Sequence, residues 1–153
     1  TIMQKNKVAM PFIVFAVLLS ACQSGNTGDK QEKAKKEIQQ AEKDFEKMTA
    51  EKGIAEAFWF FADSSAVIRG ANDSLILGKV GIRNFFSADR FQTASVKWSP
   101  DFIDAAESRD MGYTYGKYTW QSKDSTGKVS ESKGVFHTVW KKQKDGSWKF
   151  VWD

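Results

Sequence analysis

The chain has 153 residues, with 23 basic and 19 acidic side chains and a formal net charge of only +4, which allows one domain with its own core. Basic residues are scattered among the acids without a basic, aromatic-rich patch, which excludes a typical nucleic-acid-binding surface. Cys22 is the only cysteine and His137 the only histidine, so neither an intramolecular disulfide nor a Cys/His zinc set can form. We also find no phosphate-cradling glycine loop, so no metal, cofactor or nucleic acid is expected.

The first 21 residues are typical of an export signal and not of a folded domain. Lys5 and Lys7 precede the apolar run 8–19, which is shorter than the roughly 20 residues of a membrane span. Leu19-Ser20-Ala21-Cys22 follows, and this order resembles the signal of a bacterial lipoprotein, in which cleavage leaves a lipidated Cys22 as the first residue. The alternative is an ordinary signal peptide, or a chance apolar tail, with an incidental cysteine. The lipoprotein interpretation predicts an exported domain, anchored by lipid in the bacterial cell envelope.

After the signal peptide (1–21), the polar segment 22–30 is predicted to be a flexible tether and 31–153 to be a single domain. Removal of 1–21 eliminates two lysines and no acid, so the net charge falls to +2 and gives no argument for nucleic acid.

Three helices are predicted in the first part of the domain. The first begins at Asp29, with Glu32 as its capping-box partner, and ends near Ala50, before Gly53. A short second helix, 54–62, carries four consecutive aromatic residues and should be buried on several sides. A small hairpin is expected over 66–69 and 75–77, and a third helix over 79–88.

From Ala94 onward the chain has the period-two alternation of strands. A first strand must bend at Pro100, because proline cannot donate to a ladder and favours edges and bulges. Further strands are predicted over 111–121, 129–142 and 148–152, the last two joined by an Asp145-Gly146 turn. Trp148 and Phe150 alternate with polar or smaller neighbours and should be buried. Helices followed by an antiparallel meander indicate an α+β fold with the helices on one face of the sheet.

From about Ile38 to Asp153 the order of short motifs resembles the SnoaL-like, nuclear transport factor 2-like superfamily, in particular its bacterial lipoproteins of unassigned function. The motifs are Glu51-Lys52-Gly53-Ile54, Ala57-Phe58, Ala66-Val67, Gly78-Lys79 with Ile82, Trp98-Ser99-Pro100-Asp101-Phe102, Gly112-Tyr113-Thr114-Tyr115-Gly116, Phe136-His137-Thr138-Val139-Trp140 and Asp145-Gly146-Ser147-Trp148. The resemblance implies a cone-shaped α+β fold, a pocket between the helices and a curved, mostly antiparallel sheet, and a homodimer packed through the sheets.

Candidate site residues come from the strands and the second helix. Tyr113 and Tyr115 share one strand face and are expected to line the pocket with Trp59 and Trp98, unless they are ordinary core residues. His137 is expected at this pocket as well, out of hydrogen-bond reach of a carboxylate. It is the candidate catalytic acid or base, although a lone histidine between two valines is more often structural or at an interface. The alternation along this strand is the reason for placing the two tyrosines at the pocket. Gly112 and Gly116 lie on the opposite face of the strand and leave that face thin enough for close sheet packing.

Two functions remain open from the sequence. The first is a membrane-tethered accessory module that binds a small apolar or amphipathic molecule. The second is a cofactor-free enzyme of the isomerase or dehydratase type, with pocket Tyr and His side chains as acid and base. A purely structural dimer with a collapsed core is a third interpretation. The absence of a clear acid–base pair favours the binding module.

Overall fold

The computed structural model describes residues 27–153, and the predicted signal segment, Cys22 and most of the tether lie outside them. Within these residues the order of elements is α1 (Thr27–Lys52), α2 (Ile54–Phe61), β1 (Ala62–Arg69), the 3₁₀ turn η1 (Ala71–Asp73), β2 (Leu75–Leu77), α3 (Gly78–Phe86), the 3₁₀ turn η2 (Asp89–Phe91), β3 (Ser95–Ala105), β4 (Met111–Lys123), β5 (Val129–Lys142) and β6 (Trp148–Trp152).

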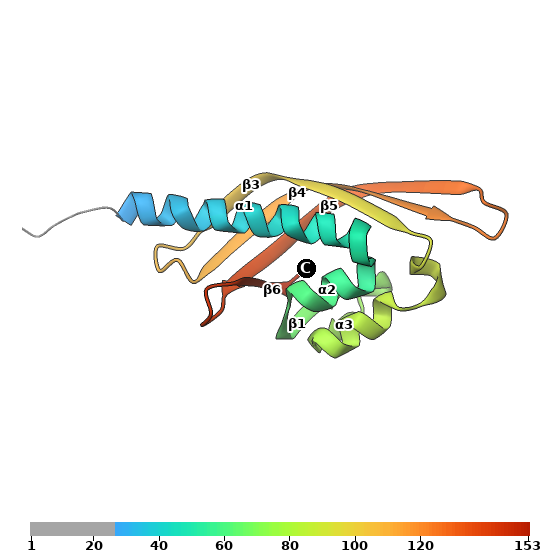
Figure 1. Cartoon of the computed structure of the whole chain (residues 1–153), viewed down its shortest axis with the longest axis horizontal. Helices are drawn as coiled ribbons and strands as arrows, with labels where there is room; N and C mark the ends of the chain where they lie inside the picture. Colours follow the sequence, from blue (N-terminus) through green and yellow to red (C-terminus); the bar gives the residue numbers. More distant parts are fainter. Residues whose placement is uncertain (1–26) are drawn as a thin grey trace, which may run out of the picture.

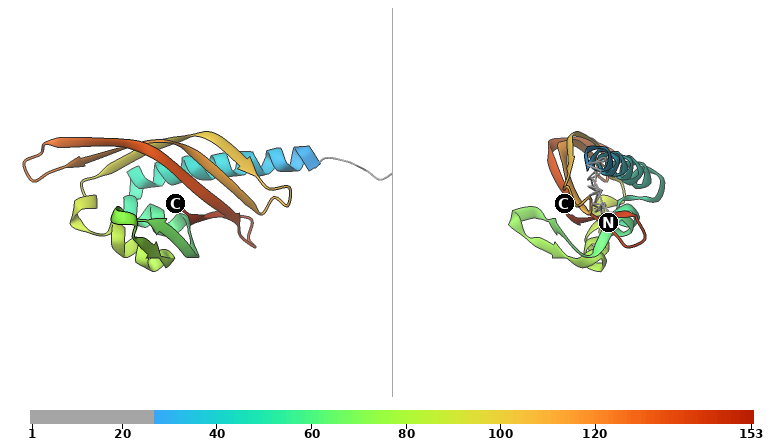
Figure 2. Two further views of the ribbon diagram at one scale, coloured as in Figure 1. Left: turned by 180° about the vertical axis from the view of Figure 1, so that it is seen from behind. Right: turned by 90° about the vertical axis from the view of Figure 1, so that its left-hand side faces the viewer.

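The strands described in 27–153 form one six-stranded sheet in the order β2-β1-β6-β5-β4-β3. Neighbours pair antiparallel, except that β1 and β6 run parallel. The long helix α1 lies along the sheet, and α2 and α3 lie beside β1 and β6 (Figure 1). Figure 2 shows the sheet curving over the helices. The α+β fold with helices packed on a curved, mostly antiparallel sheet is therefore confirmed.

Helix α1 begins earlier than the sequence predicts. Residues 27–30 are already helical, so the expected tether of 22–30 shares its last four residues with α1. Asp29 lies in the first turn and not before it, where its negative charge is favourable near the amino-terminal end of the helix dipole. The predicted stop is confirmed: Gly53 separates α1 from α2 with φ of 88°, a left-handed conformation that glycine adopts without steric cost.

Pro100 lies in β3, which is an edge strand of the sheet. The pairing with β4 shifts register between Pro100 and Phe102, so one extra residue is accommodated there. An edge position and a bulge are where a strand tolerates a proline, because the missing N–H then leaves no ladder acceptor unpaired. The bend predicted at this residue is confirmed.

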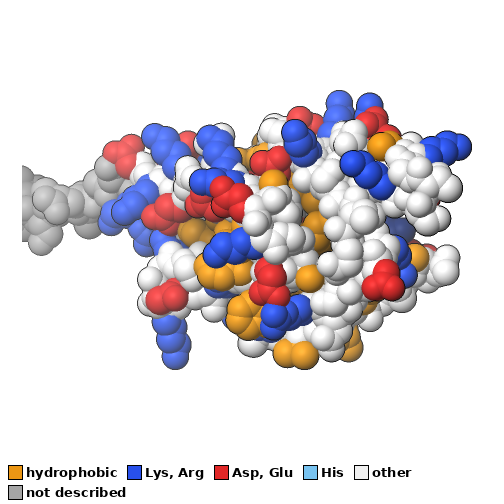
Figure 3. All heavy atoms as spheres, turned by 45° about the vertical axis from the view of Figure 1, so that its right-hand side comes forward, with side chains coloured by type: hydrophobic (Ala, Val, Ile, Leu, Met, Phe, Trp, Pro, Cys, Tyr) orange, Lys and Arg blue, Asp and Glu red, His pale blue; other side chains and the backbone are white. Residues whose placement is uncertain are grey.

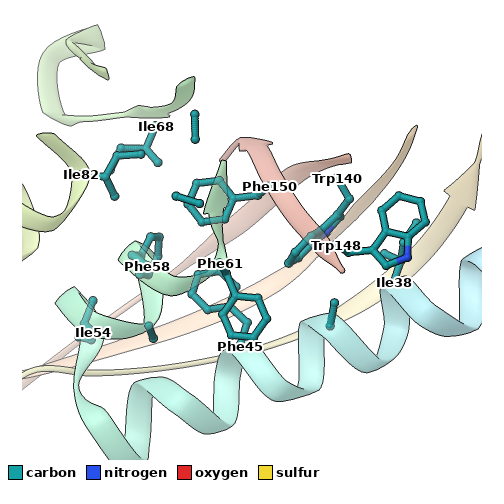
Figure 4. Close-up of a cluster of buried hydrophobic side chains, with 14 of the residues drawn as sticks. Ile38, Phe45, Ile54, Phe58, Phe61, Ile68, Ile82, Trp140, Trp148 and Phe150 are labelled. Carbon is teal, nitrogen blue, oxygen red and sulfur yellow. The ribbon is translucent and has the colours of Figure 1, made fainter. Parts of the chain in front are cut away.

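Aromatic rings from the helices and the sheet meet in one core, which Figure 4 shows around Phe45 of α1. The Phe45 ring lies 4.8 Å from that of Phe58, 4.9 Å from that of Trp98 and 5.7 Å from that of Phe150, measured between centroids. The predicted burial of Trp148 and Phe150 is confirmed, since these side chains are 5% and 0% exposed. Phe45 thus connects α1 with α2, β3 and β6.

A glutamate-to-indole contact attaches α1 to the β5–β6 hairpin. Glu37 of α1 accepts a hydrogen bond from Nε1 of Trp148 at 3.0 Å and forms an ion pair with Nζ of Lys142 at 2.6 Å. The Lys142 ammonium group holds the pKa of the Glu37 carboxyl below its ordinary value. The hairpin is therefore fixed to the helix by polar contacts at its turn end and by aromatic packing further along.

We predict that Phe150→Ala will lower the free energy of unfolding by roughly 3–5 kcal/mol, the usual cost of removing a buried ring and leaving a cavity. Phe60→Ala is the matched control, because Phe60 is 45% exposed and should cost less than about 1.5 kcal/mol. Urea titrations of both variants measure the difference. Equal losses would show that the ring of Phe150 is not part of a close-packed core.

Candidate functional site

A cavity of about 630 Å³ lies between the inner face of the sheet, which faces α1, and the segment from α3 to η2. Ten aromatic residues of the described chain line it: Phe45, Phe58, Phe85, Phe86, Phe91, Trp98, Tyr118, Trp120, Phe136 and Trp152. Buried lining residues such as Phe45, Phe58 and Val96 form its deep wall, whereas Arg69 and Ser132 are exposed and mark its mouth. The cavity is therefore apolar inside and open to solvent at one end.

The wall beside Trp98 is held in place by a buried carboxyl. Glu42 of α1 is 2% exposed and accepts hydrogen bonds from Nε1 of Trp98 at 2.7 Å and Nε1 of Trp140 at 2.9 Å. The hydroxyl of Thr114 donates a third, short hydrogen bond to the same carboxyl. Burial raises the pKa of Glu42, while the three donors oppose that rise. The orientation of the Trp98 indole thus depends on Glu42.

A β-bulge places an acid in the cavity. Trp140 pairs with Phe150, but its neighbour Val139 pairs with Trp152, so Val151 is an extra residue in β6. This extra residue reverses the alternation after Phe150 and places the side chain of Asp153 on the inner face, where it accepts a hydrogen bond from the Thr138 hydroxyl at 2.9 Å. Asp153 is the one acidic residue lining the cavity within the described range 27–153.

The backbone of Asp153 continues the pairing of the sheet. Its N–H donates to the carbonyl oxygen of Val67 at 3.1 Å, and its carbonyl oxygen accepts from the N–H of Arg69 at 3.0 Å. Asp153 is therefore held on both sides, by β1 through the backbone and by β5 through its side chain. Burial raises the pKa of the Asp153 carboxyl to about 7; the hydrogen bond from Thr138 lowers it and the nearby charge of Glu42 raises it.

The residues that the sequence predicts for one pocket do not all lie at the cavity. Trp98 lines the cavity as predicted, and His137 borders it. Trp59 lies away from the cavity and packs instead under the Lys79 ammonium group, 4.1 Å from its ring centroid. The His137 side chain is exposed and its ring is 5.9 Å from that of Tyr113, which places it on the outer face of the sheet, turned away from the helices. This orientation argues against His137 as an acid or base for a ligand in the cavity.

Tyr113 and Tyr115 also lie on the outer face and do not line the cavity, so the strand parity is the reverse of the expected one. The reason is visible at Gly112: a Cβ atom there would lie 2.4 Å from Cδ1 of Ile38 in α1. The glycine gives the helix, and not a second sheet, close access to β4. Thr114 shares that inner face and is buried against Glu42.

The outer face carries an exposed apolar patch, which we call the outer patch: Phe102, Tyr113, Tyr115 and Val135. The rings of Phe102 and Tyr115 stack at 5.1 Å, and His137 lies beside Tyr113. By contrast, on the surface shown in Figure 3 basic and acidic side chains alternate, with hydrophobic atoms exposed between them.

The sequence reasoning missed Asp153, because strict alternation from Trp148 and Phe150 assigns Asp153 to the outer face. Residues 151–153 include no glycine or proline that would indicate a bulge. It also missed Glu42, which has the charge of the solvated helix face but lies beside Ala41 and Phe45 on the apolar side. One signal was available: Trp98 of β3 and Trp140 of β5 lie on either side of β4, and their indole N–H groups need partners when they are buried.

We predict that ionisation of Asp153 lowers stability between pH 3.8, the ordinary pKa of an aspartate, and about 7, its pKa in the folded chain. In this window the folded state holds a proton that the unfolded state has released, so the free energy of unfolding decreases as the pH rises. Asp153→Asn removes this contribution. Its stability relative to the unmodified chain should therefore increase from about pH 4 to about pH 7 and then level off, measured by urea titration.

Asp110→Asn is the control, because the hydrogen bond from Ser108 lowers the pKa of Asp110. The contribution of Asp110 is lost as the pH falls toward its lowered pKa, so this variant should show no gain above about pH 5. If the difference in the free energy of unfolding between Asp153→Asn and the unmodified chain does not change with pH, the carboxyl of Asp153 titrates as an exposed group.

No family model and no curated protein matches the chain by sequence, whereas its three-dimensional arrangement matches many solved structures. A nuclear transport factor 2-like superfamily protein from Salmonella enterica superposes with a TM-score of 0.65 at 14% identity, over 79% of this chain and 88% of that one. A ketosteroid isomerase-like protein from Erwinia carotovora atroseptica gives 0.61 at 15% identity, over 75% and 89%. The association domain of C. elegans CaMKII gives 0.59 at 16% identity, over 81% and 95%. The chain therefore has the nuclear transport factor 2-like fold.

Proposed function

We propose that this chain is a binding module that takes a small, largely apolar molecule into the cavity beneath its sheet. The observation that carries the proposal is the cavity itself, about 630 Å³ in volume and walled by aromatic rings. Ligand sites in proteins have about 300–1,000 Å³, mostly apolar walls and a few polar groups that fix orientation. Asp153 supplies such a polar group at the inner wall, and Arg69 supplies another at the mouth.

The six tryptophans provide an internal test of this proposal. Trp98, Trp120 and Trp152 line the cavity, whereas Trp59, Trp140 and Trp148 do not. Titration of the full chain with 4-phenylbutanol should shift the indole N–H resonances of the first group in ¹⁵N NMR spectra, with saturation. The resonances of Trp59 and Trp148 should stay in place. Shifts spread over all the indoles, or none, would contradict binding in this cavity.

Proton transfer is a second candidate function, and the pKa of about 7 at Asp153 favours it. A general acid or base works best when its pKa is near the operating pH, and Asp153 lines an apolar cavity where a substrate would be desolvated. Asp153 takes the role for which His137 was considered. If the chain accelerates exchange of the α-protons of a bound ketone with D₂O, Asp153→Asn should lower that rate about 10²–10⁴-fold. An unchanged rate would eliminate the proposed role of Asp153.

We further propose that the domain is anchored in the bacterial cell envelope through lipid on Cys22, which lies outside the described residues. The support is the sequence: Lys5 and Lys7, the apolar run 8–19, and the small residues before the cysteine. None of the helices within 27–153 combines the length and apolar character of a membrane-spanning segment. Labelled fatty acid should be incorporated into the chain and not into Cys22→Ser. Equal label in both proteins would contradict lipidation.

A homodimer packed through the outer patch is the last part of the proposal. Phe102 is 40% exposed, Tyr115 is 41% and Val135 is 73%, and exposed apolar side chains gathered on one face are typical of protein–protein contact sites. The CaMKII neighbour is described as an association domain, which is consistent with assembly of this fold. Tyr115→Glu should shift the chain from dimer to monomer in sedimentation equilibrium. A chain that is monomeric before the substitution would contradict this part.

A further inference from the structure

Asp153 lies in the cavity without a cationic partner. Its side chain accepts a hydrogen bond from the Thr138 hydroxyl, and no ion pair to Asp153 is formed by a Lys, Arg or His of residues 27–153. Asp153 is half-buried, and acids that are withdrawn even partly from water are normally paired with a cation, because removing an isolated charge from water is costly. A ligand that brought a positive charge to this position would supply the missing partner.

The candidate partner for Asp153 among the described lining residues is Arg69, which already pairs with another acid. Arg69 lines the mouth of the cavity, but its guanidinium group pairs with Asp73 at 3.0 Å, and its side chain is 68% exposed. Its charge is therefore shared with Asp73 and screened by solvent. No lysine lines the cavity among the described residues.

The other charged groups near Asp153 also favour a cation. Glu42 of α1 lies on the same inner face and adds negative potential at Asp153 when it is ionised. From β5, the His137 ring lies on the opposite face of the sheet beside Tyr113. From β4, Tyr118 contributes an uncharged ring to the lining. Arg69 of β1 is thus the one opposing charge among the described lining residues.

The aromatic walls add a second, independent attraction for positive charge. The face of a tryptophan ring attracts an ammonium group more strongly than those of the other aromatic side chains. Trp98 and Trp120 both line the cavity, and Trp98 is fixed by its hydrogen bond to Glu42. Because that hydrogen bond already uses Nε1 of Trp98, the ring offers a ligand its face and not its N–H donor.

We propose that the cavity binds an organic cation, an ammonium group on an aromatic or apolar body, with the ammonium at Asp153 and the body against Trp98 and Trp120. This inference rests on the proposed binding function and names the chemical class of its ligand. A bound cation stabilises the ionised form of Asp153, so binding releases a proton where the carboxyl is protonated beforehand. The affinity for a cation therefore decreases below about pH 7.

Three compounds with one carbon skeleton test the inference on the full chain: 4-phenylbutylamine, 4-phenylbutanol and 4-phenylbutyrate. At about pH 8 we expect the amine to bind about tenfold more tightly than the alcohol, and the carboxylate most weakly, by calorimetry. Asp153→Asn should reduce the affinity for the amine about tenfold, to about that for the alcohol, and should change the affinity for the alcohol much less, because asparagine keeps a polar group at this position. Asp110→Asn, which removes an exposed carboxyl outside the cavity, should change neither.

A second measurement needs no variant. Between about pH 8 and about pH 6 the affinity of the unmodified chain for the amine should decrease about tenfold, while that for the alcohol stays constant. Equal or tighter binding of the alcohol would overturn the cation inference and leave the proposed binding function intact. Tightest binding of the carboxylate would assign the polar contact to Arg69 and overturn it as well. If none of the three binds, both the inference and the proposed binding function fail.

Discussion

One buried carboxyl joins the helix layer to the sheet. Glu42 of α1 accepts hydrogen bonds from Trp98 of β3, Thr114 of β4 and Trp140 of β5, so a single side chain contacts three neighbouring strands. Each donor is an obligatory polar group in an apolar layer, and leaving one of them unpaired costs about 1–3 kcal/mol. Aromatic packing around Phe45 is non-directional and would tolerate several helix positions. The three hydrogen bonds select one of them.

The same carboxyl connects stability with the site. Trp98 is bonded to Glu42 on one side and lines the cavity on the other, so the ring that would contact a ligand is already oriented. A preorganised side chain loses little conformational freedom on binding, which favours affinity. The glycine at position 112 has a related effect, because it lets Ile38 and α1 approach β4 closely enough for the carboxyl of Glu42 to reach Thr114.

The sequence was sufficient to predict where the helices and strands lie, but not which side of a strand faces the helices. Period-two alternation located β5 and β6 at their observed bounds, and Pro100 identified an edge strand with a bulge. The alternation could not decide which side of β4 faces the helices. Tyrosine is compatible with a buried and with an exposed environment, and glycine permits close approach of a helix or of a second sheet. The bulge at Val151 had no sequence signal at all. The assignment of Tyr113 and Tyr115 to the cavity, and the omission of Asp153, both follow from that limit.

Glu42 and Asp153 show how two acids on one apolar face acquire different roles. Thr114 and Thr138 are paired across β4 and β5, and each donates its hydroxyl to one of the two acids. Glu42 has two further donors, both indole N–H groups, so its hydrogen-bonding capacity is used within the fold. Asp153 lies at the cavity wall with the Thr138 hydroxyl as its side-chain donor, and a carboxyl group can accept more hydrogen bonds than one. The unused capacity is what a ligand can satisfy, and it exists because one extra residue in β6 turned the carboxyl inward.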